Sequence, residues 1–370
     1  MRNLGEPREA SRSLRRNNRA FGSLPYQTAP LLESKRPLGK LCLCYPTHVS
    51  RSLKAHILLV LITLIWGATF VVIKNALADV TPLFFNAVRM SLAAVILALI
   101  FHKELRHLTA GAIAYGTLIG ACMWMGNELQ TSGLQYTTPS KSAFLTGVAV
   151  VLVPVLLAVI WKRAINRWSA LGIALAFVGL YLLTVPSSST GNLQSIHRGD
   201  LLSLGAAVIF AFHIIFMGRA TEKHSWRQIA VVQTSAAALL MIITVPIAEK
   251  AAVVWSPPVI SGILITGFLS LALSFSVQAW AQQFTPATHT ALIFSLEPVF
   301  AWLTSFLFLG ERLGTRAGFG ALLILAGVLT SEEKGSVESL PASPDHAGVP
   351  AGVPEFETKS KPGLAGVGTR

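Results

Sequence analysis

Hydrophobic residues gather in blocks of roughly 18 to 24 positions along the chain, and short polar stretches separate the blocks. About 20 apolar residues, each rising 1.5 Å along a helix, cross the roughly 30 Å hydrocarbon core of a bilayer. A backbone in that core must pair its own polar groups, and the blocks lack the alternation of a membrane barrel, so we expect helices. The pattern predicts an all-α integral membrane protein with ten transmembrane helices, at 56–77, 82–101, 110–133, 140–161, 168–185, 200–218, 227–247, 257–282, 288–309 and 315–331.

The two halves of the chain resemble each other when the sequence is shifted by 148 residues. The shift aligns polar and small residues with one another, among them Gln130 with Gln278, Gln135 with Gln283, Gly172 with Gly320 and Gly179 with Gly327. Five spans in each half is an odd number, so the second half must enter the membrane upside down. The sequence therefore predicts two inverted five-helix repeats, a design of secondary transporters that places the binding site near the midplane between the repeats.

Polar segments flank and divide the two predicted repeats. We expect the repeats at 56–185 and 200–331, joined by a linker at 186–199. Residues 1–55 form a basic extension with little apolar periodicity, and residues 332–370 form a tail rich in Gly, Pro and Ser. Both end segments are predicted to be disordered. Whether residues 1–50 are translated stays open, because an overlong gene model would also account for them.

Charge supports a membrane location. Only 13% of the residues are charged, against about 25% in a typical soluble domain. The net charge is +13, and eleven of the 30 Lys and Arg residues lie within 1–55. A basic segment before a first span is typical of a cytoplasmic anchor held by anionic lipid, and we expect no nucleic-acid partner. Connections on the N-terminal side carry eight Lys and Arg residues against five on the other side, which predicts cytoplasmic termini in a bacterial inner membrane.

Glu297 is the sharpest candidate for chemistry, because it lies near the middle of the predicted span 288–309. An acid at that depth costs about 2.5–3.5 kcal/mol on insertion scales, so it should face the protein interior or a wet cavity. It is either a substrate or proton site, or a structural acid bonded to backbone groups that Pro298 leaves free. Pro298 and Pro154 interrupt corresponding spans, and we expect both to bend their helices near the transport site.

Other polar and aromatic residues lie deep in the spans. His213 could shuttle protons near neutral pH, or be a histidine satisfied within the bundle. Trp66, at the centre of the first span, could line a cavity or pack in the core. Arg89 needs a partner, for which a neighbouring carbonyl is the expected choice. Glu128, with its neighbours Asn127 and Gln130, could rim a substrate cavity or lie at an interface.

Residues near span ends, and the cysteines, have simpler interpretations. Lys74 and Lys141 are expected to extend their ammonium groups toward the membrane surface. The three cysteines show no metal or disulfide spacing, so no metal site is predicted. No Gly-x-x-x-x-Gly-Lys-Ser/Thr loop occurs, so the chain does not carry an ATP motor of that type.

Several stretches are similar to a known family. The chain resembles the drug/metabolite transporter superfamily, in its EamA-like branch, over about 56–331, at Trp66-Gly67-Ala68-Thr69-Phe70, from Pro82 to Arg89, from Gly133 to Gly147, at Leu296-Glu297-Pro298-Val299-Phe300 and at Leu309-Gly310-Glu311-Arg312-Leu313. The first half departs from the family pattern, with Trp161-Lys162-Arg163 in place of the Gly-Glu-Arg turn. The resemblance implies ten helices, two EamA-like domains, cytoplasmic termini and export of small metabolites. It also implies that a central cavity lies between the spans that carry Trp66, Glu128, His213, Gln278 and Glu297.

We therefore expect a secondary transporter that exports a small organic metabolite by alternating access, with proton coupling through Glu297 or His213 as a hypothesis. The substrate and the lipid bilayer are the expected partners, no cofactor is expected, and a homo-oligomer is left open. A membrane-embedded enzyme is one alternative, but it would need a cluster of His, Asp or Glu that the sequence lacks. A non-transporting scaffold or sensor is another, and the polar residues deep in the spans argue against it. The sequence fixes neither the substrate nor the direction of transport.

Overall fold

The computed structural model describes residues 50–184, 198–309 and 315–335, and these residues are almost entirely helical. One isolated antiparallel pairing joins Val80 to Val253 within these ranges. The tails and the linker predicted from the sequence lie largely outside the described residues. The first helix begins at Arg51, five residues before the predicted span, because the Ser50 hydroxyl caps it by accepting from the Leu53 amide.

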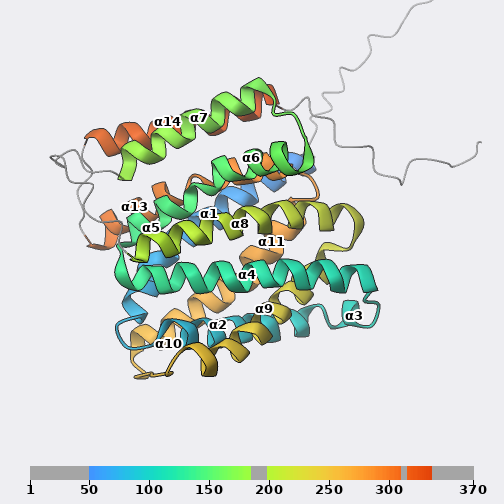
Figure 1. The fold of residues 1–370 in the computed structure, drawn as a ribbon, viewed down its shortest axis with the longest axis vertical. Coiled ribbons are helices and arrows are strands. Elements are labelled where there is room, and N and C mark those ends of the chain that lie inside the picture. Colours follow the sequence, from blue (N-terminus) through green and yellow to red (C-terminus); the bar gives the residue numbers. More distant parts are fainter. Residues whose placement is uncertain (1–49, 185–197, 310–314, 336–370) are drawn as a thin grey trace, which may run out of the picture. The chain divides into compact units, whose positions relative to one another are not determined.

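The helices follow one another with short connections (Figure 1). The first half contains α1 (Arg51–Ala76), α2 (Pro82–Ile100), α3 (His102–Leu105), α4 (Ala110–Tyr136), α5 (Pro139–Gly147), α6 (Ala149–Trp161) and α7 (Arg167–Thr184). The second half contains α8 (Arg198–Lys223), α9 (Trp226–Ala248), α10 (Pro257–Ile265), the π-helix η1 (Thr266–Leu273), α11 (Ser274–Ala281), α12 (Ala287–Phe294), α13 (Glu297–Leu309) and α14 (Thr315–Gly335).

Seven helical segments are long and apolar enough to cross a membrane, namely α1, α2, α5–α6, α8, α9, α10–α11 and most of α12–α13. The stretches Arg167–Leu182 in α7 and 318–331 in α14 are shorter apolar helices. The 27-residue α4 carries Asn127, Glu128 and Gln130 among many small residues, which lowers its mean hydropathy. The protein is therefore an all-helical, multi-span membrane protein.

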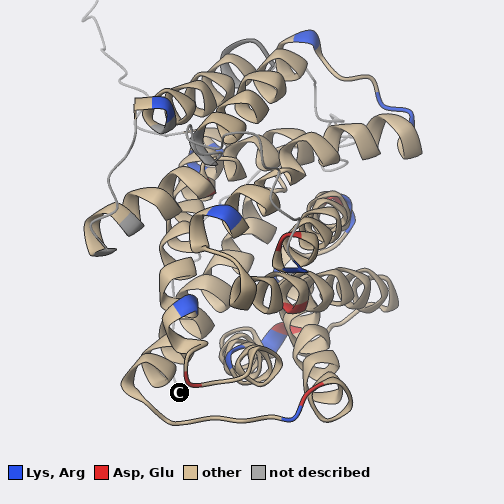
Figure 2. Ribbon diagram, turned by 60° about the vertical axis from the view of Figure 1, so that its left-hand side comes forward, with Lys and Arg blue, Asp and Glu red and all other residues tan. Residues whose placement is uncertain are grey.

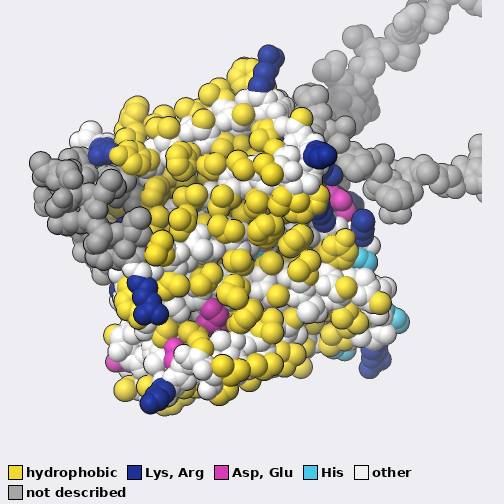
Figure 3. All heavy atoms as spheres, viewed as in Figure 1, with side chains coloured by type: hydrophobic (Ala, Val, Ile, Leu, Met, Phe, Trp, Pro, Cys, Tyr) yellow, Lys and Arg dark blue, Asp and Glu magenta, His cyan; other side chains and the backbone are white. Residues whose placement is uncertain are grey.

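The surface of the bundle suits a lipid environment. Large apolar side chains such as Leu99, Val159 and Ile247 are mostly exposed, and apolar atoms cover most of the face shown in Figure 3. Lys and Arg side chains gather toward two ends of that face. Most of the ribbon between helix ends carries no charge (Figure 2). Such a surface would be an aggregation hazard in water, but it matches the hydrocarbon core of a bilayer.

We name the two ends of the bundle after α1. The Arg51 end holds the start of α1 and the connections 101–109, 162–166, 224–225 and 282–286. The Ala76 end holds the connections 77–81, 137–138 and 249–256. These connections appear at opposite sides of Figure 1.

Helices of the two halves pack against each other in exchanged pairs. α4 packs on α8 and α9 of the second half, while α10, η1 and α11 pack on α1 and α2 of the first. α1 contacts α12 and α13, and α8 correspondingly contacts α5 and α6. α2 pairs with α9, and α7 pairs with α14. Each contact thus has a counterpart in which the halves are exchanged, as expected for a two-fold related pair of repeats.

Two of the predicted spans are broken into pairs of shorter helices near their prolines. Proline lacks an amide donor and clashes with the carbonyl four residues earlier. The break between α5 and α6 lies at Val148, between one and two turns before Pro154, and the break between α12 and α13 lies at Ser295 and Leu296, just before Pro298. At the second break the Leu296 amide donates to Ile293 O, three residues back. A third predicted span is interrupted by η1 instead, with no proline near its centre.

The helices α7 and α14 lie side by side in backbone contact (Figure 1). A Cβ atom added to Gly172 would lie 2.6 Å from Gly327 O, and one added to Gly327 would lie 2.5 Å from Gly172 O. About two turns further along α7, a Cβ atom added to Gly179 would lie 2.6 Å from Gly320 O. The glycines are needed because any side chain here would separate the two helices.

The variant Gly327→Ala tests this contact. We expect the forced separation to lower the free energy of unfolding by about 1–3 kcal/mol, seen as a lower midpoint of thermal unfolding in detergent. Gly205→Ala is the matched control, because the nearest atom to its new methyl group is Leu129 Cδ1 at 3.4 Å. Equal midpoints for the two variants would contradict the backbone contact.

Candidate functional site

A central cavity of about 80 Å³ lies among helices of both halves. Side chains from α1, α2, α4, α5, α6, α8, η1, α11, α12 and α13 line it. At roughly 10–15 Å³ for each water, the cavity has room for about six water molecules, which is the scale of a small organic solute. Four of the five predicted binding residues line it, namely Trp66, His213, Gln278 and Glu297.

Aromatic rings form one wall of the cavity. Trp66 of α1 packs on Phe275 and Phe294, with ring centroids 5.2 and 4.9 Å apart. Its indole nitrogen donates to Ser270 O in η1, at 2.9 Å. Trp66 therefore both lines the cavity and packs in the bundle, so the two readings of this residue do not exclude each other.

Glu297 projects into the cavity from the first turn of α13. Its carboxylate has no hydrogen bond or ion pair within the described residues, so the backbone groups near Pro298 do not hold it. A Cβ atom on Gly67 would lie 2.8 Å from Glu297 O, so α1 approaches the start of α13 very closely and fixes the position of this residue. The amino end of a helix also favours a negative charge.

His213 faces the same cavity from α8 and is buried. Its Nε2 atom lies 3.1 Å from Gln233 Oε1, and its ring meets that of Phe275 edge to face at 5.4 Å.

Gln130 and Gln278, which align in the sequence repeat, also both line the cavity. Gln130 donates to Thr146 Oγ1 at 3.2 Å, and Gln278 donates to Gln282 Oε1 at 2.9 Å. The carbonyl oxygen of Gln278 is buried without a partner. An unsatisfied acceptor in a cavity wall can receive a hydrogen bond from a solute.

A polar cluster joins α2 to α4 beside the cavity. Arg89 donates through Nε and Nη2 to Asn86 Oδ1, at 3.0 and 2.8 Å, and through Nη2 to Asn127 Oδ1 at 3.0 Å and to Thr131 Oγ1 at 3.3 Å. The expected carbonyl partner of Arg89 is thus replaced by side-chain oxygens. The Asn86 amide in turn donates to Asn127 O and to Glu128 Oε2, both at 3.1 Å.

Glu128 lies in this cluster and is not among the residues that line the cavity. One of its oxygens is bonded to Asn86, and the other is buried without a partner. Arg89 and Asn127, by contrast, do reach the cavity wall. Asn86 is the residue that sequence reasoning missed, although an Asn one helical turn before a buried Arg was a usable signal.

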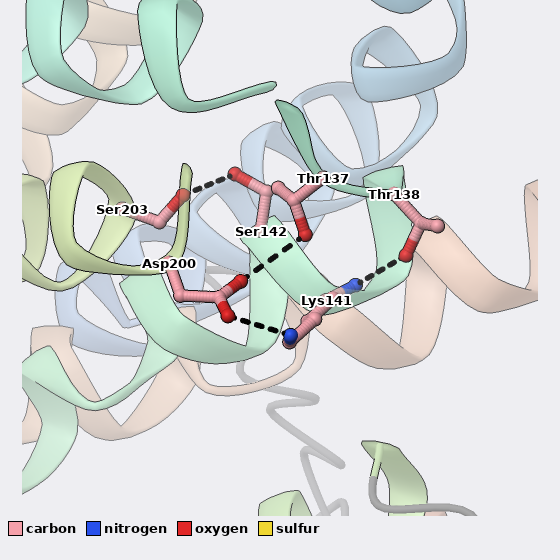
Figure 4. Close-up of polar contacts among 6 residues, drawn as sticks. All are labelled: Thr137, Thr138, Lys141, Ser142, Asp200 and Ser203. Atoms are coloured by element: carbon pink, nitrogen blue, oxygen red, sulfur yellow. Dashed lines mark hydrogen bonds and ion pairs between the residues drawn. The ribbon is translucent and has the colours of Figure 1, made fainter. Parts of the chain in front are cut away.

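Polar contacts join the helices at the Ala76 end of the bundle. Lys74 Nζ donates to the O atoms of Leu134, Gln135 and Thr137, at 2.7, 3.1 and 3.0 Å, and so caps α4. Lys141 of α5 pairs with Asp200 of α8 at 2.7 Å (Figure 4). Lys74 does not extend freely toward the surface as expected, because it donates to three backbone carbonyls. The Lys141 side chain remains 43% exposed while it pairs with Asp200.

Two hydroxyl groups and one more carboxylate add to these contacts. Ser142 and Ser203 share a hydrogen bond of 3.0 Å beside the Lys141–Asp200 pair (Figure 4). Glu249 accepts from the amides of Leu83 and Phe84, at 3.1 and 3.0 Å, and caps α2.

A second hollow, of about 110 Å³, lies at the Arg51 end. It is lined by residues of α6 and α8 and of the connections 162–166 and 282–286. Pro154 borders this hollow, whereas Pro298 lies beside Gly147 near the central cavity. Within the described residues no group of His, Cys, Asp or Glu could hold a metal ion.

Comparison with known proteins places the chain among transporters. The sequence model of the EamA-like transporter family matches residues 53–185 and 197–331. An uncharacterized transporter of Archaeoglobus fulgidus is 32% identical over 281 residues, covering 75% of this chain and 86% of that protein. The uncharacterized transporter YoaV of Bacillus subtilis is 25% identical over 277 residues, covering 72% and 92%.

Two further matches concern location and fold. The uncharacterized inner membrane transporter YedA of Escherichia coli is 30% identical over 215 residues, covering 56% of this chain and 66% of that protein. A solved crystal structure with 13% sequence identity superposes with a TM-score of 0.62 and covers 77% of this chain and 99% of the other. At that identity the likeness shows the fold alone.

The variant Asn86→Ala tests the polar cluster. It removes one acceptor of Arg89, which keeps Asn127 Oδ1 and Thr131 Oγ1. We expect the free energy of unfolding to fall by about 1.5–3 kcal/mol, the contribution of hydrogen bonds to a charged group. Asn75→Ala is the control, because Asn75 is exposed near the end of α1. If both variants unfold at the same temperature in detergent, Asn86 does not hold Arg89 in place.

Proposed function

This chain belongs to the EamA-like transporter family, and we propose that it is a secondary transporter that moves a small organic solute out of the cell by alternating access. The observation that carries the proposal is a cavity that both halves enclose and into which the carboxylate of Glu297 projects without a partner among the described residues. A site between two repeats, near the membrane midplane, is the arrangement on which alternating access depends.

The transmembrane architecture in this proposal has ten spans as two inverted five-helix repeats. The first repeat, over 56–185, consists of α1, α2, α4, α5–α6 and α7, and the second, over 200–331, of α8, α9, α10–α11, α12–α13 and α14. The exchanged helix pairs support the two-fold relation between them. The alignment of Gln130 with Gln278, both of which line the cavity, supports it independently.

In the proposed orientation the Arg51 end faces the cytoplasm of the cell and both termini lie on that side. The connections at this end carry more Lys and Arg than those at the Ala76 end. The relative named as an inner membrane transporter supports the same membrane. The conformation described above is then closed toward the outside by the contacts of Lys74 and Lys141.

The solute we favour carries a protonated amine. Glu297 supplies a negative charge that has no partner among the described residues, and desolvated carboxylates need one. The rings of Trp66, Phe275 and Phe294 nearby offer faces that attract cations. Gln278 offers an unsatisfied carbonyl oxygen for a further hydrogen bond. A proton and the amine would compete for Glu297, which would couple outward movement of the solute to inward movement of a proton.

The variant Glu297→Gln tests this coupling. In proteoliposomes with an internal pH dye, we add amino acids and polyamines one at a time and measure proton flux. Loss of a charge-assisted contact of about 1.5–3 kcal/mol should lower the solute-dependent flux roughly ten- to hundredfold. Glu104→Gln is the control, because Glu104 forms only a surface pair with Arg227, at 3.2 Å.

Undiminished flux in Glu297→Gln would overturn the role of Glu297 in coupling. If His213→Gln abolishes the flux while Glu297→Gln does not, the coupling proton passes through His213. If no solute in the series evokes flux in the unaltered protein, the amine assignment is wrong.

The variant Asp200→Asn tests closure of the Ala76 end. The Lys141–Asp200 pair is partly exposed, and such a pair stabilises the closed conformation by about 1 kcal/mol or less. Its loss should raise the fraction of molecules that are open at this end by up to about fivefold. The readout is the rate at which an impermeant maleimide labels Ser142→Cys from outside, in a protein without its three native cysteines. Arg227→Gln breaks one pair at the opposite end and should not accelerate labelling; equal acceleration by both variants would contradict the proposal.

A further inference from the structure

A hollow of about 320 Å³ lies on the side of the bundle, outside the central cavity, between α1, α2 and the segment η1–α11. Its walls are almost wholly apolar and include Leu58, Ile96, Ile100, Phe268 and Val277. The Ser276 hydroxyl in the wall already donates to Ala272 O, at 2.7 Å. The hollow therefore offers its occupant apolar contact and no hydrogen bond from this hydroxyl.

The depth of the hollow corresponds to one leaflet of a bilayer. It extends along η1–α11 from Phe268 to Trp280, at the Arg51 end. Twelve residues at 1.5 Å cover about 18 Å, slightly more than half of the roughly 30 Å hydrocarbon core. A lipid acyl chain that enters from the membrane surface would fill this length.

The mouth of the hollow is basic. Lys54 is exposed, and its ammonium lies 5.6 Å from the centroid of the Trp280 ring. Arg51, one turn earlier on α1, lies over the Phe284 ring at 6.0 Å. Neither cation has an ion pair with a carboxylate within the described residues. On the far side of the mouth Arg227 is neutralised by Glu104.

Two tryptophans stand at the same level. Trp226 of α9 and Trp280 of α11 both line the hollow near the Arg51 end. Tryptophan prefers the zone of lipid headgroups, where its ring is partly in hydrocarbon and its N–H group can reach water. The tryptophans thus mark the headgroup level, and the two cations lie where a phosphate would be.

We propose that this hollow binds one anionic phospholipid, with an acyl chain between α1, α2 and α11 and the phosphate between Lys54 and Arg51. The apolar wall suits an acyl chain, and the length of the hollow matches a chain within one leaflet. The two cations, which have no ion pair within the described residues, suit an anionic headgroup. The site is separate from the solute cavity, and its occupancy does not depend on the transport function proposed above.

The site also has a direct connection to the solute cavity, because both share η1. Phe268, Ala272 and Leu273 of this π-helix line the lipid hollow, while Ser270 and Leu271 line the solute cavity. Trp66 is bonded to Ser270 O on the cavity side. A chain seated against η1 would hold this segment, and with it the aromatic wall, in place.

Native mass spectrometry of the full chain tests the proposal, with micelles that contain phosphatidylglycerol or phosphatidylcholine. We expect one phosphatidylglycerol per protein to survive detergent removal, and phosphatidylcholine to be retained at least tenfold less. Removal of both cations in Arg51→Gln/Lys54→Gln should lower retention of phosphatidylglycerol tenfold or more, at about fivefold for each residue. Leu58→Trp, which fills the hollow and leaves the charges intact, should lower retention of both lipids.

The matched control is Lys103→Gln/Arg106→Gln, which removes two exposed cations at the same end but outside the hollow. Equal loss of phosphatidylglycerol in the control and in the Arg51/Lys54 variant would reduce the effect to general surface charge and overturn the site. Equal retention of the two lipids by the unaltered protein would overturn the anionic preference. Competition by glycerol phosphate without acyl chains would show a phosphate site and overturn the lipid.

Discussion

A guanidinium group buried among hydrocarbon side chains has to be satisfied by its own protein, and Arg89 meets this demand with oxygens of Asn86, Asn127 and Thr131. Removing a charge from water costs several kcal/mol, and only good geometry with full hydrogen bonding offsets that cost. The acceptors come from both α2 and α4, so the two helices cannot slide past each other without exposing the charge. Because Arg89 and Asn127 also reach the cavity, one wall of the solute site is fixed by the same bonds.

The part of the cavity wall that carries Glu297 and His213 is less fully hydrogen-bonded. Glu297 lies at the break between α12 and α13, and its carboxylate has no partner among the described residues. His213 lies where the two halves meet and contacts Gln233. Cavities with strong hydrogen bonds on one side and unsatisfied groups on the other are suited to a solute that completes the set. The two halves also differ at this wall. Glu297 aligns with Ala149 in the sequence repeat, so only the second half supplies an acid to the cavity.

Local pattern was sufficient to predict the helices, because apolar blocks in a membrane protein have one main way to pair their backbones. The starts of α2 and α7 fall within a residue of expectation. Candidate residues such as Trp66 and Gln278 could also be found, since polar or aromatic side chains at mid-depth stand out. What could not be predicted depends on contacts between distant segments. Lys74 finds its acceptors 60 or more residues away, and no local pattern shows that.

The break positions and η1 escaped sequence reasoning for a related reason. A proline marks where a hydrogen bond is lost, but the packing around it decides where the helix parts, and η1 has no proline near its centre to mark it. The sequence left Glu128 either at the rim of a cavity or at an interface, because depth alone does not show which way a side chain faces. A helix turns by about 100° at each residue, and this was enough to turn Glu128 away from the cavity while Asn127 faces it.

The glycine contact between α7 and α14 constrains how the two halves can move. At Gly172 and Gly327 the backbones touch. The two helices cannot come closer without a clash, and they cannot move apart without losing contact along the pair. One helix of the pair comes from each half, and neither helix lines the solute cavity. The halves also touch where Gly133 of α4 meets Gly199 of α8. Any movement of one half against the other must therefore carry these backbone contacts along intact or break them.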